Sequence, residues 1–424
     1  MDQADFDRVK QSFGAFHRQF APLFGRPQTE RRSKQYLGGL LVQQTRRRNA
    51  ENLSEAVEGA TPRALQRFLT NSPWLTERVI DRLQAYVGQR LSTLDGVFVV
   101  DETGFAKQGK KSVGVARQYS GTLGKVANCQ VGVFLAYVSE RGHALVDGEL
   151  YLPQRWTEDR QRCREAGVPE TVGFRTKAEL ALMSLRGAQQ AGHLMGHWVT
   201  ADEHYGQVPT FRDALDAEGW HYVLEVPCTT PVFEQVAKVE MPAWCGRGQK
   251  PSRPRLVDGE ARASTVKALA SSLAAVDWQV LTAGEGAQGP RRYRFAARRV
   301  WESREQLPGR ECWLVFRSNL DGSEPKYYLS NALADTSLLR LAQVGAMRWC
   351  VETELRTDKG ETGLDEYEVR SWQGWHHHIV LAMLAGAFLL SLQLERGKKG
   401  ATDHTTAGQQ GAPRVASPTK VDVR

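Results

Sequence analysis

The sequence predicts an α/β protein in which a mixed sheet is flanked by helical segments at both ends of the chain. Residues 1–92 have apolar side chains at helical spacing. From about residue 95, short apolar runs rich in β-branched residues alternate with helical patterns, and helical spacing returns after residue 331. With 424 residues, of which 41% are hydrophobic and 25% charged, the chain is long enough for two or three packed units.

The N-terminal region, residues 1–92, is predicted to be a small helical domain. Its apolar residues recur every three or four positions, as in Phe6, Val9, Phe13, Phe16 and Phe20. The run Arg46, Arg47 and Arg48 lies within this region. Clustered arginines in a helical module indicate a candidate DNA-binding domain, whereas a solvent-exposed helix face is the commoner outcome for such a run. Both interpretations stay open at this point.

Residues 93–228 have the pattern of a sheet. Apolar runs predict strands at 97–100, 114–119, 130–137, 144–151, 198–201 and 222–226, and helical spacing predicts helices at 177–190 and 209–217. Four successive strands followed by strand, helix and strand predict a sheet with mixed strand directions.

The character of the chain changes between residues 229 and 330, where two glycine-rich loops separate further strand patterns. One further strand is predicted over residues 293–301, and Arg292 directly precedes it. Because side chains in a strand alternate with a period of two, Arg292, Arg294 and Arg298 would share one face. We expect a basic ribbon that contacts phosphate, and the alternative is a solvated strand face. Trp301 and Trp313 are candidates for base stacking, although most aromatic residues in strands belong to the core.

Residues 331–395 are predicted to be helical again. A first helix covers 337–359, and a second, over 375–394, is apolar nearly all round and is therefore expected to be buried. Its apolar run, 379–392, is shorter than the roughly 20 residues that a bilayer requires, which favours a core helix over a membrane span. The composition of residues 396–424, rich in Gly, Thr, Gln and Pro, predicts a disordered tail.

Charge and cysteine content narrow the functional classes. The chain has 56 basic and 48 acidic residues, a net charge of +8 and a pI of about 9.2, which favours a polyanionic partner. Its six cysteines form no Cys-x-x-Cys pair, so neither a zinc ribbon nor a disulfide framework is indicated. The acidic start of the chain is unlike a signal peptide. We therefore expect a cytosolic protein with reduced, buried thiols and no membrane partner.

Carboxylates follow two of the predicted strands at the same place. Asp101 comes directly after 97–100, and Asp202 comes directly after 198–201, each followed by a Glu and then a predicted glycine turn. A further carboxylate, Glu352, lies on a predicted helix. If the two strands are neighbours, Asp101 and Asp202 come within reach of each other. Three carboxylates supply the oxygen ligands that Mg²⁺ or Mn²⁺ prefers, so the sequence indicates a metal site.

Arg348, Glu352 and Lys359 share one face of this helix, because their spacings of four and seven residues are close to one and two turns. An exposed ladder of ion pairs is the commonest meaning of such spacing. The two strand-end aspartates favour a different interpretation. With two metal ions roughly 3.5–4 Å apart, one activates a water or a 3′-hydroxyl while the other stabilises the leaving oxygen. Arg348 and Lys359 would then neutralise the flanking phosphates.

Several nearby ionisable residues are weaker candidates. Four further glutamates are either alternative metal ligands or surface charges: Glu102, Glu203, Glu354 and Glu361. Surface positions are favoured for Glu102 and Glu354. His204, beside Asp202, is expected to be an ordinary core or surface histidine. The run from His376 to His378 cannot converge on one ion, because consecutive helical residues point about 100° apart.

Taken together, these residues give the chain a resemblance to bacterial insertion-sequence transposases of the DDE class, whose catalytic core is like ribonuclease H. The matching segments are VDETGF (100–105), GVARQYSG (114–121), LYLP (150–153), WVTADE (198–203) and RWCVE (348–352) running on to KGE (359–361). The resemblance covers about residues 40–395. It implies that Asp101, Asp202 and Glu352 form an acidic triad, and that Arg348 and Lys359 belong to a Tyr-Arg-Glu-Lys signature.

The resemblance also implies how the chain is organised. Residues 1–92 would be the DNA-binding domain, 93–228 and 331–395 the two parts of a ribonuclease H-like core, and 229–330 a β-rich insertion between the second Asp and the Glu. One position departs from the family pattern. Gly345 stands three residues before Arg348, where the signature tyrosine is expected. The contact made by that tyrosine must therefore be absent or come from another residue, which leaves open whether a hairpin intermediate is used.

The activity implied by the resemblance is metal-dependent DNA cleavage and strand transfer at the ends of an insertion sequence. The implied partners are double-stranded DNA, as terminal repeats and target, and further copies of the chain, because joining two ends needs two active sites. The implied location is the bacterial cytosol, at the nucleoid. Two alternatives stay open: a structure-selective nuclease that does not join strands, and a DNA-binding derivative without catalysis, against which the intact triad argues.

Overall fold

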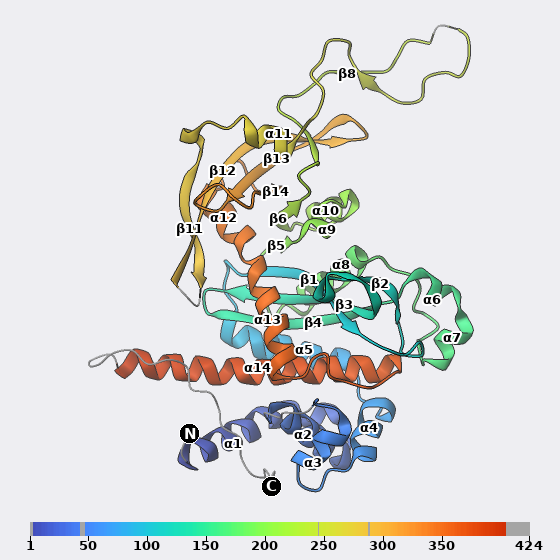
Figure 1. The fold of residues 1–424 in the computed structure, drawn as a ribbon, viewed down its shortest axis with the longest axis vertical. Helices are drawn as coiled ribbons and strands as arrows, with labels where there is room; N and C mark the ends of the chain where they lie inside the picture. The colour runs from blue at the N-terminus through green and yellow to red at the C-terminus, as the bar shows by residue number, and fades with distance from the viewer. Residues whose placement is uncertain (1–2, 43–46, 245, 287–288, 404–424) are drawn as a thin grey trace. The chain divides into compact units, whose positions relative to one another are not determined.

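The computed structural model describes residues 3–42, 47–244, 246–286 and 289–403 (Figure 1). Its residues fall into two compact units. The first unit contains residues 1–196 and 350–424, and the second contains residues 197–349. Arg46 and Cys245 lie outside the described residues, as does the part of the predicted tail from residue 404 onwards.

Helices form the N-terminal part of the first unit: α1 (Gln3–Arg18), η1 (Ala21–Phe24), α2 (Pro27–Leu41), α3 (Ala50–Ala56), α4 (Pro62–Asn71) and α5 (Thr76–Leu91). Local sequence explains where several of them begin. The side chain of Asn49 accepts the backbone N–H of Asn52 in the first turn of α3, and the side chain of Thr61 accepts that of Ala64 in α4, as N-cap residues do. The aromatic side chains of Phe16, Phe20 and Tyr86 pack together and join these helices.

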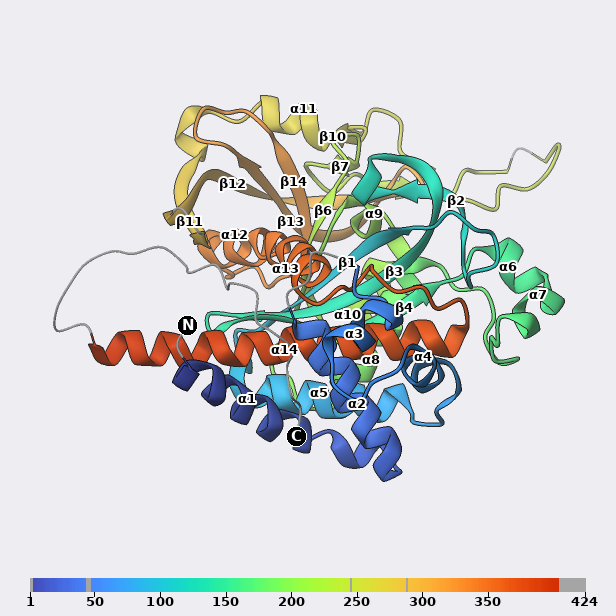
Figure 2. The same cartoon turned by 60° about the horizontal axis from the view of Figure 1, so that its bottom comes forward.

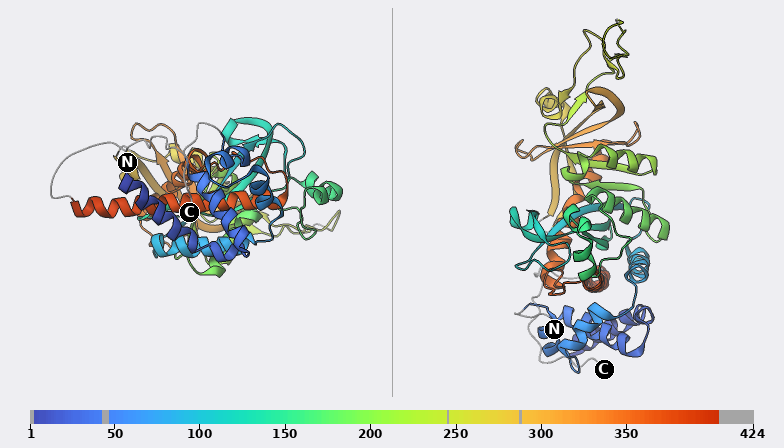
Figure 3. Two further views of the ribbon diagram at one scale, coloured as in Figure 1. Left: turned by 90° about the horizontal axis from the view of Figure 1, so that it is seen from below. Right: turned by 90° about the vertical axis from the view of Figure 1, so that its right-hand side faces the viewer.

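The long helix α14 (Trp372–Asp403) belongs to the same unit and contacts both the N-terminal helices and the sheet (Figures 1 and 3). Residues 372–396 are long and apolar enough to cross a membrane, contrary to the sequence-based estimate of a shorter run. However, 78% of their most apolar window is buried inside the protein, as expected for a core helix. The helix also continues to Asp403, beyond the predicted start of the tail at residue 396, and the disorder of the tail stays a prediction.

The sheet of the first unit is antiparallel. It consists of β1 (Val97–Ala106), β2 (Ala116–Ser120), β3 (Lys125–Ser139) and β4 (Gly142–Tyr151), with β3 pairing to each of the other three. Helix α14 packs on β4, and α8 (Lys177–Ala191) packs on β3 and β4 (Figure 2). The remaining helices of this unit are η2 (Gly121–Leu123), α6 (Gln154–Glu158), α7 (Arg160–Glu165) and α13 (Arg348–Glu361), whose first two residues are assigned to the second unit.

Strand β1 extends beyond the residues predicted for it. The segment from Asp101 to Gly104, expected to leave the strand through a glycine turn, continues the pairing with β3 up to Ala106. Gly104 has a packing role here, because a Cβ at this position would lie only 2.4 Å from Ser120 Oγ. The glycine therefore permits a close approach of two chain segments and does not end the strand.

The second unit contains parallel strands β5 (Trp198–Ala201) and β6 (His221–Val226), connected through α9 (Glu203–Gly206) and α10 (Pro209–Ala217). The long strands β12 (Gly289–Arg304) and β13 (Leu307–Ser318) form a hairpin, and β14 (Lys326–Ser330) joins β13 to β6. The other elements are β7 (Pro231–Phe233), β8 (Val239–Glu240), β9 (Arg255–Leu256), β10 (Ser264–Thr265), α11 (Val266–Ser271), η3 (Ala275–Asp277), β11 (Gln279–Gly286) and α12 (Leu338–Ala346).

The predicted fold class, α/β with strands of mixed direction, is confirmed. Antiparallel strands come first along the chain and a parallel pair follows. The helix predicted over residues 337–359 is instead two helices, α12 and α13, separated at Met347. The domain boundaries proposed from the sequence stay a prediction, and the compact units divide the chain at other positions, near residues 196 and 350.

The burial expected of the cysteines is confirmed in part. Cys129, Cys163, Cys312 and Cys350 are buried and form no disulfide. Cys228 is also free but exposed, contrary to the prediction that all thiols are buried.

Candidate active site

Asp101 lies within strand β1 of the first unit. The four residues before it, Val97 to Val100, are completely buried, and Asp101 itself is 8% exposed. Its backbone pairs with Phe134 of β3, and its Oδ1 accepts the N–H of Glu102 at 2.7 Å. The carboxylate is therefore attached to a rigid part of the sheet, which is where a functional group is held most accurately.

Helix α13 is tied to this strand by Lys359. The Lys359 ammonium donates to Thr103 Oγ1 at 2.6 Å and to the carbonyl oxygen of Gly104 at 3.4 Å. Thr103 and Asp101 share a face of β1, because residues two apart in a strand point the same way. Burial lowers the pKa of Lys359. The structure thus brings one signature residue of α13 to the strand that carries Asp101. Glu352, seven residues earlier on the same helix, is exposed.

The other side of α13 contains two buried carboxyl groups, one turn apart. Glu354 is 9% exposed, and burial raises its pKa to about 7. Burial, with a second contribution from Glu354, raises the pKa of Asp358 well above its usual value. Asp358 packs closely against α14, since a Cβ at Gly386 would lie 2.6 Å from Asp358 Oδ1. His143 of β4 lies 3.7 Å from Glu354.

The surface position predicted for Glu354 was therefore wrong. Glu354 is buried between elements of the first unit. Glu102 is half-buried and forms an ion pair with Lys177 of α8. The partner of Glu354 is His143 and that of Glu102 is Lys177. Both partners come from distant segments, so the spacing of residues along the chain did not indicate them.

The arginine run 46–48, predicted to contact DNA, does not act as one surface. Arg47 is exposed, whereas Arg48 is 5% exposed. The Arg48 guanidinium donates to the carbonyl oxygen of Gly360 at 2.9 Å and lies 3.5 Å from the Glu366 carboxylate. Its backbone N–H donates to the same carboxylate at 2.7 Å. Arg48 thus fastens the end of α13 and is not accessible as a DNA contact.

Asp202 lies in the second unit, directly after the buried strand β5, and is the N-cap of α9. Its Oδ1 accepts the backbone N–H of His204 at 3.0 Å. His204 and Glu203 are exposed. Since Asp101 and Glu352 belong to the first unit, the convergence of the three carboxylates stays a prediction. Among the residues that the structure describes, no group of three or more His, Cys, Asp or Glu side chains is placed to hold a metal.

Arg348 has an acidic partner in the second unit. Its Nε lies 3.3 Å from Glu225 of β6, a residue that is 3% exposed and also pairs with Lys326. A buried carboxylate between two cations holds the Arg348 side chain in place at the start of α13. The sequence analysis missed Glu225, which lies within an apolar run.

Gly345, which stands where the signature tyrosine is expected, is closely packed on α12. A Cβ there would be 3.2 Å from Val223, a tight contact, and 3.5 Å from the ring of Tyr328, an ordinary van der Waals contact. Tyr328 is itself 3% exposed, so it does not offer the missing side chain to a ligand.

The arginines of β12 agree with the predicted pattern only in part. The face that carries Arg294 and Arg298 also carries Ala296 and Val300, which belong to a buried core cluster. The Arg294 guanidinium lies 5.0 Å from the Trp278 ring, and Arg298 pairs with Asp277 at 3.3 Å. Arg292 is exposed. The predicted basic ribbon is therefore not continuous.

The aromatic and histidine candidates have intramolecular partners. Trp313 donates its indole N–H to the carbonyl oxygen of Leu333 at 3.0 Å, and Trp301 is half-buried. The Nδ1 atom of His378 is hydrogen-bonded to the hydroxyl group of Tyr36 at 2.8 Å. His377 stacks on Trp74 with 3.6 Å between ring centres. The histidine run thus has separate partners, in agreement with its rejection as a metal site.

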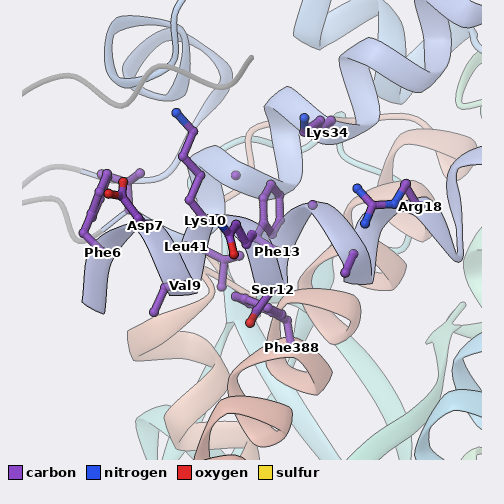
Figure 4. Close-up of a pocket in the computed structure, with 15 residues that line it drawn as sticks. Phe6, Asp7, Val9, Lys10, Ser12, Phe13, Arg18, Lys34, Leu41 and Phe388 are labelled. Carbon is purple, nitrogen blue, oxygen red and sulfur yellow. The ribbon is translucent and has the colours of Figure 1, made fainter. Parts of the chain in front are cut away.

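A pocket of about 840 Å³ lies between α1, α2 and Phe388 of α14 (Figure 4). Its apolar side chains include Phe13 and Leu41, and its basic side chains are Lys10, Arg18 and Lys34. None of the predicted site residues lines it. The candidate site is therefore defined by the carboxylates and their neighbours and not by this pocket.

Comparison with known proteins places most of the chain in a family. The family described as DDE superfamily endonuclease matches residues 19–290. A probable transposase for insertion sequence element IS701 from Microchaete diplosiphon is 29% identical over 192 residues, which are 45% of this chain. The chain spans about half, 47%, of the length of that curated relative. A structural comparison matches a piggyBac transposase synaptic complex with hairpin DNA at 10% identity, covering 73% of this chain and 49% of the other, with a TM-score of 0.32.

Proposed function

Because this chain belongs to the DDE superfamily of endonucleases, we propose that it is the transposase of a bacterial insertion sequence, which cleaves DNA at the element's ends and joins them to a target. The contact of Lys359 with Thr103 carries the proposal, since it joins the helix of Glu352 to the strand of Asp101. The similarity to an insertion-sequence transposase supports the same function.

We assign metal binding to Asp101, Asp202 and Glu352. Carboxylate oxygens are the donors that Mg²⁺ and Mn²⁺ prefer, so the chemistry of this donor set fits a divalent ion, or two. Such ions supply an activated oxygen nucleophile and stabilise the leaving oxygen. Lys359 and Arg348 are proposed to hold the phosphates next to the reacting bond, each kept in place by the contacts described above.

We further propose that the substrate is double-stranded DNA, both as terminal repeats and as target. The net charge of +8 supports a polyanionic partner. Arg47 and Arg292, which are exposed, remain proposed DNA contacts. Because two DNA ends must be joined, two copies of the chain are expected to act together as a dimer or larger assembly. The proposed location is the bacterial cytosol, at the nucleoid.

The experiment uses the full chain and a labelled DNA that carries the sequences flanking its own gene. Cleavage and joining are measured with Mg²⁺ and with EDTA, for wild type, Glu352→Gln and Glu361→Gln. The last variant is the matched control, with the same change of charge on the same helix. Wild type is expected to cut and join only with Mg²⁺. Glu352→Gln is expected to bind DNA with unchanged affinity but to do neither.

Each departure from this result has a defined meaning. Cleavage without joined products identifies a nuclease, and DNA binding without cleavage by wild type identifies a binding protein. If Glu352→Gln is active and Glu361→Gln is not, the third carboxylate is Glu361 and the present assignment is wrong.

A further inference from the structure

The segment from Thr103 to Ser139 has an unusual distribution of charge. It contains five basic residues and no acidic residue: Lys107, Lys110, Lys111, Arg117 and Lys125. At the average acidic content of this chain, 48 in 424, about four acidic residues would be expected in a segment of this length. The segment begins two residues after Asp101 and contains the hairpin formed by β2, η2 and β3.

The tip of this hairpin exposes apolar and aromatic side chains as well as cations. Tyr119 is 60% exposed and Val126, its cross-strand neighbour, is 54% exposed. Arg117 shares the face of Tyr119, because the two are separated by two positions in β2, and it is also exposed. Lys125 is exposed at the turn. An exposed aromatic ring beside cations is the combination that single bases and phosphates require.

The hairpin lies next to the candidate site within the first unit. Ser120, on the opposite face of β2 from Tyr119, packs against Gly104 of β1, where an added Cβ would be only 2.4 Å away. η2 also contacts β1. Gly104 is one of the two residues of β1 that Lys359 binds. The exposed face of the hairpin is thus anchored to the strand segment that follows Asp101.

We infer that the hairpin of residues 117–126 is a DNA-binding surface of the active site, on which Arg117 binds a backbone phosphate and Tyr119 stacks on a base near the reacting end. This inference rests on the proposed function. A second copy of the chain is a less suitable occupant, because all charged side chains of the segment are positive and the chain has a net charge of +8. DNA complements both the charge and the aromatic ring.

The test compares Tyr119→Ala, Tyr119→Phe and Arg117→Ala with Arg164→Ala, an exposed arginine of α7 in the same unit. End DNA contains 2-aminopurine at positions close to the cleavage site, so that stacking is read as quenched fluorescence. Tyr119→Ala is expected to lose the quenching and to bind about 5- to 150-fold more weakly, whereas Tyr119→Phe retains both. Arg117→Ala is expected to raise KM with little change in kcat, and to lower the slope of log K against log salt by about 0.9.

The outcomes separate the inference from the proposed function. If wild type cuts DNA and both Tyr119→Ala and Arg117→Ala behave as Arg164→Ala does, the hairpin inference is wrong while the transposase proposal stands. If Tyr119→Ala changes the oligomeric state in light scattering but not the quenching, the surface contacts a second copy and the inference is also wrong. If wild type neither binds nor cuts DNA, the proposed function fails and the inference fails with it. Tyr119→Phe and Arg117→Lys are conservative variants that keep the ring and the positive charge. They are expected to restore the DNA binding that the corresponding Ala variants lose.

Discussion

The strand β12 and the hairpin of residues 117–126 are both basic, yet their cations have different surroundings. In β12, Arg298 pairs with Asp277, Arg299 with Glu311, and Arg304 with Asp213 and Glu302. In the hairpin, Arg117 and Lys125 are exposed, and the segment of residues 103–139 to which they belong contains no acidic residue. The number of arginines in a segment therefore does not measure the positive charge that a ligand can contact. That charge also depends on which acidic residues the fold places beside the arginines.

Buried carboxyl groups of the two units also differ in their surroundings. In the second unit, Glu302 is 2% exposed and accepts hydrogen bonds from Arg212 and Arg304. In the first unit, burial raises the pKa of Asp147 to about 7 and that of Asp358 well above its usual range. Burial is thus compensated by ion pairing at Glu302, whereas at Asp147 and Asp358 it favours the protonated form.

The largest effect is expected from breaking the buried ion pair of the second unit. Glu302→Ala leaves Arg212, which is 5% exposed, without its carboxylate partner. We expect a loss of about 3–5 kcal/mol in the free energy of unfolding, measured by urea denaturation. Glu311→Ala, which removes a partly exposed partner of Arg299 from the neighbouring strand, is the control and should cost at most about 1 kcal/mol. Equal losses in both variants would contradict the proposed difference between them.

A smaller effect, dependent on pH, is expected from Asp147 in the first unit. Its pKa is raised from 3.8 to about 7, mainly by burial and then by Glu149. The stabilising effect of the protonated group is complete below the unfolded pKa and is lost as the pH rises towards 7. Asp147→Asn keeps the shape without ionising, so its stability relative to wild type should rise by about 2–3 kcal/mol between pH 5 and pH 8. Parallel stability curves for the two proteins would show that Asp147 titrates normally.

The smallest effect distinguishes two arginines of the same strand. Arg292 is exposed, whereas Arg298 is engaged by Asp277. Arg292→Ala is therefore expected to weaken DNA binding and to reduce its salt dependence by about one counterion. Arg298→Ala should change DNA affinity less and cost at most about 1 kcal/mol of stability. Both are measured by fluorescence anisotropy at several salt concentrations, and equal effects on affinity would restore the continuous ribbon predicted from the sequence.

Local patterns were sufficient for much of the fold. The apolar run before Asp101 and the one before Asp202 predicted strands, and both strands are present and buried. These predictions succeeded because strand and helix periodicity depends on neighbours in the sequence. The end of β1 was missed because Gly104 serves the packing of Ser120, a contact that sequence spacing does not reveal.

The roles of individual charged residues were harder to predict from the sequence. The run at 46–48 has uniform chemistry, yet Arg48 is buried against Gly360 and Glu366 while Arg47 is exposed. Likewise Glu354, expected on the surface, is buried and faces His143. The partners of both residues are more than 200 positions away in the chain, so no local pattern indicates them.

The sequence by itself determined which residues are candidates for chemistry, and it predicted the carboxylates Asp101, Asp202 and Glu352, with Lys359 on the helix face of Glu352. Tertiary structure decided which charges are available, because the pKa, exposure and partners of a side chain depend on segments brought together by folding. That is why Arg298 and Arg48 are engaged within the protein, whereas Arg117, in a segment without acidic residues, is exposed beside the strand of Asp101.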